Sequence, residues 1–150
     1  MKSFKIITLL VASTLAFAVS ASPSVIEVKM MTQSPDGKAL VFDPMFVKAN
    51  VGDTIKFEPM QKAGHTSVSL FVPEGITPWH GKPDTEMVVK LDKQGVYLVE
   101  CDVHKMMGMV AVVQVGNPTN LEDAKKVAAK ESAKMMMNKD RFAKLLDEVK

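Results

Sequence analysis

The sequence predicts a mainly β protein, a Greek-key sandwich or barrel of seven to eight short strands followed by two C-terminal α-helices. Up to residue 115, short segments of alternating apolar and polar residues are separated by turns that contain glycine or proline. After Pro118 the composition changes abruptly to Ala, Lys, Glu, Met and Leu, which favour helix. With 150 residues, 47% of them hydrophobic and 24% charged, the chain has the composition of one ordinary globular domain.

The first four predicted strands follow from a hydrophobic period of two. Residues 25–30 alternate apolar and polar side chains, and the apolar segment 39–42 follows a Pro-Asp-Gly turn. Residues 46–48 lead into a Val-Gly-Asp turn, after which residues 54–58 alternate again. Each of these segments is therefore expected to place one face in a core.

The remaining strands are separated by one irregular stretch. Residues 66–70 keep the alternation, whereas residues 73–83 contain three prolines and two glycines and predict a loop. Apolar segments at 87–91, 96–99 and 109–115 complete the series. Short strands at this spacing are typical of a sandwich or barrel.

Two short helices are expected within residues 119–150. Residues 119–122 match a capping box, and Leu121, Ala124 and Ala128 share one helical face. For the second helix, Asn138 is the expected N-cap, and the apolar face consists of Phe142, Leu145, Leu146 and Val149. Because short helices are marginal on their own in water, both are expected to pack on the sandwich.

Residues 1–21 have the pattern of a secretory signal peptide. Lys2 and Lys5 precede an apolar run that ends in small residues before Ser22. The run is shorter than the about 20 residues that span a bilayer, so no membrane anchor is expected after cleavage. We therefore expect residues 22–150 to form a single periplasmic domain, with residues 119–150 as a helical extension packed on it.

Charge and cysteine content exclude several classes of function. Lys and Arg total 19 against 17 Asp and Glu, and Lys2 and Lys5 account for the excess, so a nucleic-acid partner is not indicated. A single cysteine, Cys101, permits neither a disulfide framework nor a multi-cysteine zinc or iron–sulfur site. In an oxidising compartment such a thiol is expected to be either buried and inert or bound to a metal.

The loop between the last two predicted strands carries three metal-ligating residue types within nine residues. Cys101, His104 and Met109 form a C-x2-H-x4-M pattern, and a hairpin connection brings these side chains toward one point. His65 follows Gly64 at the start of an earlier strand and can supply a second imidazole. Two His, one Cys and a distant Met make the trigonal site with a long axial bond that is typical of copper electron-transfer centres.

This pattern resembles the ligand pattern of type 1 blue copper proteins of the cupredoxin superfamily, and the sequence is similar to the pseudoazurins. The resemblance runs from residue 25 to the end and rests on Val51-Gly52-Asp53-Thr54, Gly64-His65, Gly95-Val96-Tyr97, Gly108-Met109-Val110 and the two C-terminal helices. It implies a cupredoxin-like fold and one copper ion held by His65, Cys101, His104 and Met109. Met106 and Met107 compete for the axial position, and the family spacing favours Met109.

The resemblance also implies a function, which is single-electron transport by Cu(I)/Cu(II) cycling rather than enzymatic catalysis. Three strong ligands and a weak fourth leave no open position for a substrate. Electrons would pass through the edge of His104 to transiently docked partners such as copper nitrite reductase or cytochromes, and the carrier is expected to be a monomer. The expected docking patch consists of Met106, Met107, Leu40 and Pro59, with Lys62, Lys82 and Lys105 at its rim.

Several residues depart from the usual pseudoazurin pattern, among them Lys105 and Met106, which replace the usual aromatic-and-glycine pair beside His104. Thr66 stands where Asn is usual, and we expect its shorter side chain not to reproduce the link between the two ligand loops. Asp102 and Val103 replace Thr and Pro between Cys101 and His104. Asp102 is expected to bond nearby amides, and a Val103 N–H directed at the Cys101 sulfur would favour the reduced state.

Two other functions stay open from the sequence. A periplasmic copper carrier or metal-resistance protein would use the same soft ligands, and the twelve methionines favour it. A secreted interaction module with a buried thiol is the third interpretation. His80 is expected to be an ordinary loop residue, and Met135, Met136 and Met137 are expected to pack rather than to bind metal.

Overall fold

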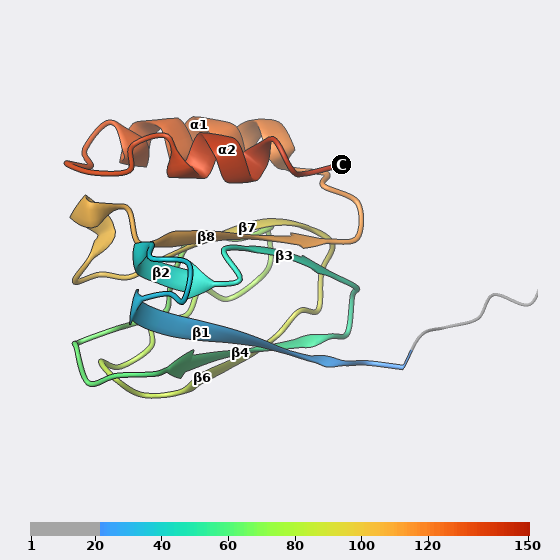
Figure 1. Ribbon diagram of the computed structural model, residues 1–150. Helices are drawn as coiled ribbons and strands as arrows, with labels where there is room; N and C mark the ends of the chain where they lie inside the picture. The colour runs from blue at the N-terminus through green and yellow to red at the C-terminus, as the bar shows by residue number, and fades with distance from the viewer. Residues whose placement is uncertain (1–21) are drawn as a thin grey trace, which may run out of the picture.

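Two four-stranded sheets face each other, and two helices cover the outer face of one of them (Figure 1). The computed structural model describes residues 22–150, so the expected signal peptide lies outside the described residues. The elements are β1 (Val25–Gln33), β2 (Ala39–Asp43), β3 (Phe46–Ala49), β4 (Thr54–Pro59), β5 (Val68–Phe71), β6 (Met87–Lys90), β7 (Gly95–Glu100), η1 (Lys105–Met107), β8 (Val110–Val115), α1 (Leu121–Ser132) and α2 (Arg141–Leu146).

The sheets have the strand orders β2-β1-β4-β6 and β3-β8-β7-β5. In each sheet one pair is parallel: β1 runs with β4, where Val28 pairs with Phe57, and β3 runs with β8. The other neighbours are antiparallel, including β7 and β8, whose ends flank the loop of residues 101–109. The hairpin between β7 and β8 therefore carries the predicted ligand loop at one end of the sandwich.

The main core lies between the two sheets. Phe57 packs edge-on against Phe42, with ring centroids 5.8 Å apart, and stacks on Trp79 at 6.3 Å. Tyr97 and Cys101 are fully buried in the same cluster. Because Cys101 belongs to this core, its thiol lies against apolar side chains.

A second core joins the sheet to the helices. Val96 and Leu98 of β7, and Val110 and Val112 of β8, face the buried side chains of α1 and α2, among them Phe142. Every residue of β7 and β8 is consequently buried. This explains why the sequence of β8 is apolar at nearly every position instead of alternating.

The predicted fold class is confirmed: residues 22–150 contain eight strands in two sheets and two C-terminal helices, and residues 73–83 form no strand or helix. Within the described part of the chain, no helix combines the length and apolar character required to cross a bilayer.

The predicted helix caps are wrong. The structure shows no capping box at 119–122, because the N-cap of α1 is Asn120 and not Thr119; the side chain of Asn120 makes no cap bond and bonds to both backbone groups of Val96, at 2.6 Å and 3.0 Å. The second helix begins after Asp140 and not after Asn138, whose amide donates to the carbonyl of Met107 at 2.8 Å. Both Asn side chains therefore connect the helical tail to the sheet and the ligand loop.

Candidate metal centre

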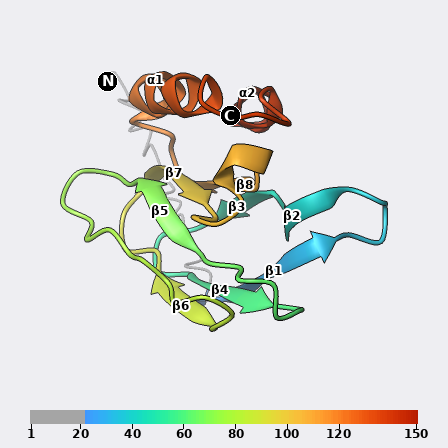
Figure 2. The same ribbon diagram turned by 90° about the vertical axis from the view of Figure 1, so that its left-hand side faces the viewer.

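Three of the predicted ligand residues lie together at the end of the sandwich. One ligand atom each from His65, Cys101 and His104 lies within 4.8 Å of the other two. Cys101 Sγ is 3.5 Å from His104 Nδ1, and the ring centroids of His65 and His104 are 5.0 Å apart. Figure 2 views the sandwich from this end, where η1 lies between the strands and the helices.

The hairpin loop is closed by its own backbone. Cys101 N–H donates to the carbonyl of Met109 at 3.0 Å, and the amides of His104 and Met109 donate to Cys101 O and His104 O at 3.1 Å and 3.3 Å. Gly108 adopts a φ of +75°, which glycine tolerates better than other residues. The turn thereby holds Met109 next to Cys101 and His104.

The three loop residues differ in exposure. Cys101 and Met109 are fully buried, as is His65, whereas His104 is partly exposed. Burial protects the thiol from solvent. The partly exposed imidazole gives the cluster one edge that a docked protein can reach.

His65 is oriented so that one ring nitrogen is free. Its Nε2 lies 3.1 Å from Thr32 Oγ1, while Nδ1 is buried and has no hydrogen-bond partner. In the tautomer in which Nε2–H donates to Thr32, Nδ1 presents a lone pair to the cluster. Burial, together with the neighbouring His104, lowers the pKa of His65 and so favours the neutral imidazole that binds metals. No pattern in the sequence connects Thr32 with His65, which is 33 positions away.

Asp84 fixes the loop that carries His65. Its carboxylate accepts the N–H groups of Ala63, Gly64 and His65 at 3.1, 3.0 and 3.0 Å. These bonds, with that from Gly64 the largest contribution, lower the pKa of Asp84. Asp84 lies in the irregular segment before β6, where no local motif identifies its role.

Thr66 connects the two ligand loops, so the expectation that this link would be missing is wrong. Its hydroxyl accepts the N–H of Asp102 at 2.9 Å. Its own N–H and hydroxyl donate to Cys101 Sγ at 3.4 and 3.6 Å. The amide directed at the sulfur therefore belongs to Thr66, whereas Val103 is 56% exposed at the surface.

Asp102 pairs with His80 instead of with nearby amides. His80 Nε2 is 2.7 Å from Asp102 Oδ2, and His80 is exposed. His80 is a loop residue, as expected, and forms an isolated bridge with Val68. The pair ties the irregular loop to the ligand hairpin without placing His80 in the metal-ligating cluster.

The surface beside His104 contains part of the expected patch. Met106 and Met107 are exposed, while Leu40 and Pro59 are partly buried. Arg141 donates to the carbonyls of both Leu40 and Gly108, so that Leu40 lies near the ligand loop.

The expected rim lysines differ in their surroundings. Lys62 and Lys82 are exposed. Lys105 is 3.4 Å from the nearly buried carboxylate of Glu100, so part of its charge is compensated. Burial raises the pKa of Glu100, and Lys105 opposes this shift.

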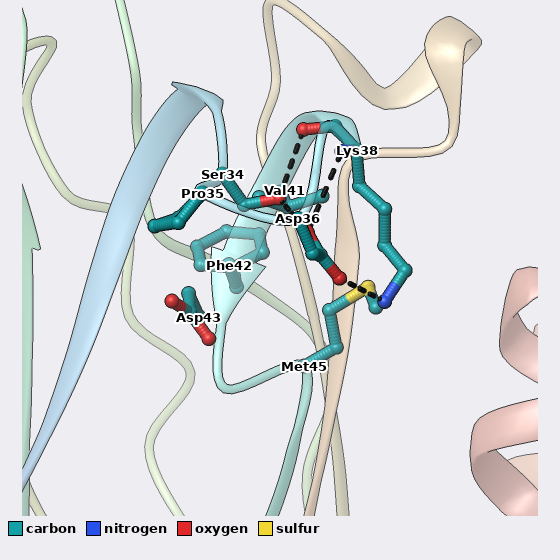
Figure 3. A pocket seen from close by; sticks show the side chains of 8 residues that line it. All are labelled: Ser34, Pro35, Asp36, Lys38, Val41, Phe42, Asp43 and Met45. Carbon is teal, nitrogen blue, oxygen red and sulfur yellow. Dashed lines mark hydrogen bonds and ion pairs between the residues drawn. The ribbon is translucent and has the colours of Figure 1, made fainter.

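A surface pocket at the turn between β1 and β2 is separate from the cluster (Figure 3). Ser34 Oγ donates to the carbonyl of Lys38 at 3.1 Å, and Lys38 pairs with Asp36. These groups of the pocket bond to one another, and none of the residues that line it belongs to the metal cluster.

The donor set fits copper. A thiolate suits Cu(I), and imidazoles suit Cu(II), so one site can serve both oxidation states. The unpartnered Nδ1 of buried His65 is the structural observation that supports a bound ion, because a buried polar atom without a partner is costly.

Comparisons with known proteins agree with this chemistry. The family of copper binding proteins described as the plastocyanin/azurin family matches residues 28–116. The pseudoazurin of Methylorubrum extorquens is 43% identical over 126 residues, covering 79% of this chain and 84% of that protein. A putative pseudoazurin of Rhizobium leguminosarum bv. viciae is 39% identical over 116 residues, 76% of each chain. The crystal structure of native pseudoazurin from Hyphomicrobium denitrificans matches with a TM-score of 0.74 at 34% identity, over 84% of this chain and 98% of that one.

Proposed function

Because the chain belongs to the pseudoazurins, within the plastocyanin/azurin family of copper-binding proteins, we propose that His65, Cys101, His104 and Met109 hold one copper ion that carries single electrons between proteins of the periplasm. The protein is a blue copper electron-transfer protein by family. The single observation that carries the ligand assignment is the cluster of one thiol and two imidazoles in which His65 Nδ1 has no other partner.

The chain's own contacts suit rapid electron transfer. Copper supplies the reversible one-electron change between Cu(I) and Cu(II). Thr66 and Asp84 hold the two ligand loops through bonds that do not depend on the ion, which keeps ligand positions similar in both oxidation states. The donors from Thr66 to Cys101 Sγ stabilise negative charge on sulfur and favour the reduced site.

The proposal includes the route of the electron and the partners. Electrons leave and enter through the partly exposed edge of His104, while buried Cys101 stays covered. Exposed Met106 and Met107 supply apolar contact, and Lys62 and Lys82 supply charge that attracts acidic partners. Suitable partners are copper nitrite reductase and cytochromes, to which the protein binds transiently as a monomer.

Residues 1–21 are proposed to be a signal peptide that directs residues 22–150 to the periplasm as one domain. The support is the sequence pattern of two lysines, an apolar run and small residues. Mass spectrometry of the protein recovered from separate periplasmic and membrane fractions tests this proposal. A mature N-terminus at Ser22 supports it, and an uncleaved chain retained in the membrane contradicts it.

The ligand proposal is tested by cupric titration of the mature protein. The wild-type chain should acquire the intense visible absorption of a thiolate bound to Cu(II), and Cys101→Ser should abolish it. His80→Gln is the matched control, since His80 lies outside the cluster and should leave the colour intact. A wild-type protein that stays colourless, or a coloured Cys101→Ser variant, contradicts the proposal.

The axial position is tested separately with Met109→Leu, a substitution that conserves volume. The colour should persist, because the three strong ligands remain, while the reduction potential rises and the EPR spectrum changes. Unchanged values in Met109→Leu would exclude Met109 as a ligand. Met106→Leu and Met107→Leu are the controls, and neither is expected to alter the EPR spectrum.

The alternative function, a periplasmic copper carrier, makes a different prediction. A carrier must release its ion readily, whereas the complete burial of His65 and Cys101 favours retention. Transfer of copper from the holoprotein to a chelator should therefore be slow. Complete exchange within minutes, together with weak colour, would favour the carrier function.

A further inference from the structure

We propose that Met106, Met107, Met136 and Met137 form a second metal site, which binds Cu(I) through thioethers at the surface beside the ligand loop. This site is distinct from the buried centre and does not depend on the function proposed for that centre.

The first observation is the unusual exposure of these side chains. Among the described residues five methionines are exposed, and four of them belong to this group, with exposed fractions of 41%, 39%, 74% and 56% in chain order. Met135 is only 3% exposed and packs under the helices. The expectation that all three residues of the 135–137 run serve packing is thus confirmed for Met135 and wrong for its two neighbours.

The second observation is that two distant segments of the chain are bonded together at these methionines. The N–H groups of Met136 and Met137 both donate to the carbonyl of Met106, at 2.7 and 3.3 Å. The amide of Asn138 donates to the carbonyl of Met107 at 2.8 Å. In Figure 1 the connection between α1 and α2 accordingly lies over the hairpin loop.

Gly108 shows how closely the two segments approach. A Cβ at this position would lie 2.7 Å from Asn138 Cβ and 2.9 Å from the carbonyl oxygen of Met137. The absence of a side chain at Gly108 therefore permits the contact. The backbones that carry the four methionines are therefore held next to one another by hydrogen bonds, which is the geometric basis for proposing a shared ion.

The chemistry of the four side chains selects the metal. Thioethers are neutral, soft ligands that suit Cu(I) and bind hard cations poorly. Two lysines nearby are paired, Lys105 with Glu100 at 3.4 Å and Lys134 with Glu131 at 2.7 Å, which limits their repulsion of a cation, whereas the guanidinium of Arg141 at the Gly108 carbonyl remains a nearby positive charge. Packing, the usual role of methionine, does not explain the exposure of Met136 and Met137, which are 74% and 56% exposed, and Met106 and Met107 are only partly covered.

Anaerobic titration of the mature protein with Cu(I), in competition with a chromogenic chelator, tests the proposal. Wild type should bind two equivalents, one at the buried centre and a weaker one at the methionines. The variant with all four methionines replaced by leucine should bind one equivalent. Met60→Leu is the matched control, because Met60 is 45% exposed but lies outside both segments, and it should keep both equivalents.

Two measurements exclude trivial explanations. Cupric colour in the fourfold variant shows that this variant is folded. Cys101→Ser, which lacks the buried centre, should still bind Cu(I) at the methionines, so a failure of the buried centre can be told apart from a failure of the methionine site. In protein with 13C-labelled methionine methyl groups, the weaker equivalent should shift the four resonances and leave Met60 unchanged.

Two results would overturn the inference. The first is equal Cu(I) stoichiometry in wild type and the fourfold variant; if that variant also reduces partners more slowly, these side chains form a docking patch only. The second is a methyl shift of Met60 as large as those of the four methionines.

Discussion

Thr66 Oγ1 lies 2.9 Å from the amide nitrogen of Asp102 and accepts its hydrogen, so a single hydroxyl joins the loop of His65 to the loop of Cys101 and His104. The same residue directs its N–H and its hydroxyl at the Cys101 sulfur. Thr66 is 1% exposed, so neither loop can replace these bonds with water. Both the alignment of the loops and the charge on the sulfur therefore depend on this side chain.

Thr66→Val should lower both the reduction potential and the stability. Valine matches threonine in shape but leaves the Asp102 amide unpaired, which costs about 1–3 kcal/mol for a buried donor. It also removes one donor from the thiolate, which strengthens sulfur donation and favours Cu(II). Voltammetry and chemical denaturation measure the two effects. Thr66→Ser restores the hydroxyl and should behave like wild type, and an unchanged potential in Thr66→Val would refute the role of the hydroxyl.

Thr32→Val should weaken copper binding by about 10–100-fold, the usual cost of losing the outer partner of a ligating histidine. The hydroxyl of Thr32 lies 3.1 Å from His65 Nε2 and fixes the ring so that Nδ1 faces the cluster. Competition with a chelator of known affinity measures the loss. Thr32→Ser is the control, and equal affinity of Thr32→Val and wild type would show that the ring is held by packing alone.

Asp84→Asn should accelerate the release of copper at neutral pH. In wild type both carboxylate oxygens accept backbone N–H groups. The NH2 group of asparagine cannot accept a hydrogen bond, so at least one of these bonds would be lost and the segment 63–65 would be less firmly held. Stopped-flow decay of the cupric absorption with excess chelator measures the rate. Glu86→Gln removes a neighbouring exposed carboxylate outside this network and should release copper at the wild-type rate. Equal rates for both variants would contradict the positioning role.

Because of Asp53, the free energy of unfolding should decrease as the pH is lowered into the acid range. Its buried carboxylate accepts bonds from Asn50 N–H and from both the N–H and the hydroxyl of Ser24, which lower its pKa below the usual 3.8. A lowered folded-state pKa stabilises the protein above pH 3.8, and this contribution is lost as the pH falls through the folded-state value. Asp53→Asn should cost about 2 kcal/mol of unfolding free energy at pH 7. In urea denaturation at pH 2 the difference from wild type should be much smaller; an equal difference at both pH values would contradict this account.

Replacing Lys62 and Lys82 by glutamine should reduce the rate of electron transfer to an acidic partner and flatten its dependence on ionic strength. Exposed charges at the edge of an interface act mainly on association and are screened by salt. Stopped-flow reduction at several salt concentrations measures both effects. Lys125→Gln together with Lys126→Gln, on helix α1, is the charge-matched control. Equal salt dependence in the two double variants would exclude steering by Lys62 and Lys82.

The sequence alone predicted those features that depend on local patterns. Alternation at 25–30 and 54–58 identified β1 and β4, and the composition after Pro118 identified the helices. The hairpin spacing of Cys101 and His104 was sufficient to predict that both belong to one cluster. In these cases the chain contacts itself over a few residues, so the sequence carries the information directly.

Features that depend on distant contacts were missed or misassigned. Thr32 is 33 residues from His65, and Asp84 is 19 residues from it, so no spacing rule connects either to that histidine. Asn120 and Asn138 have typical cap chemistry, but the side chain of each finds a partner elsewhere in the folded chain. Hydrogen bonds between distant segments are made in place of the expected cap bonds, because the helices pack against a sheet and a loop whose free backbone groups need partners.

Arg141 gives the helical tail an influence on the metal loop. One guanidinium nitrogen donates both to Leu40 O, in β2, and to Gly108 O, in the turn just before Met109. Detachment of α2 would consequently break the hydrogen bonds from Arg141 to Leu40 and Gly108, although no residue of the helical tail belongs to the cluster. Loss of the helical tail should therefore loosen the turn before Met109 as well, so that the last helix contributes to holding the loop of the proposed metal centre.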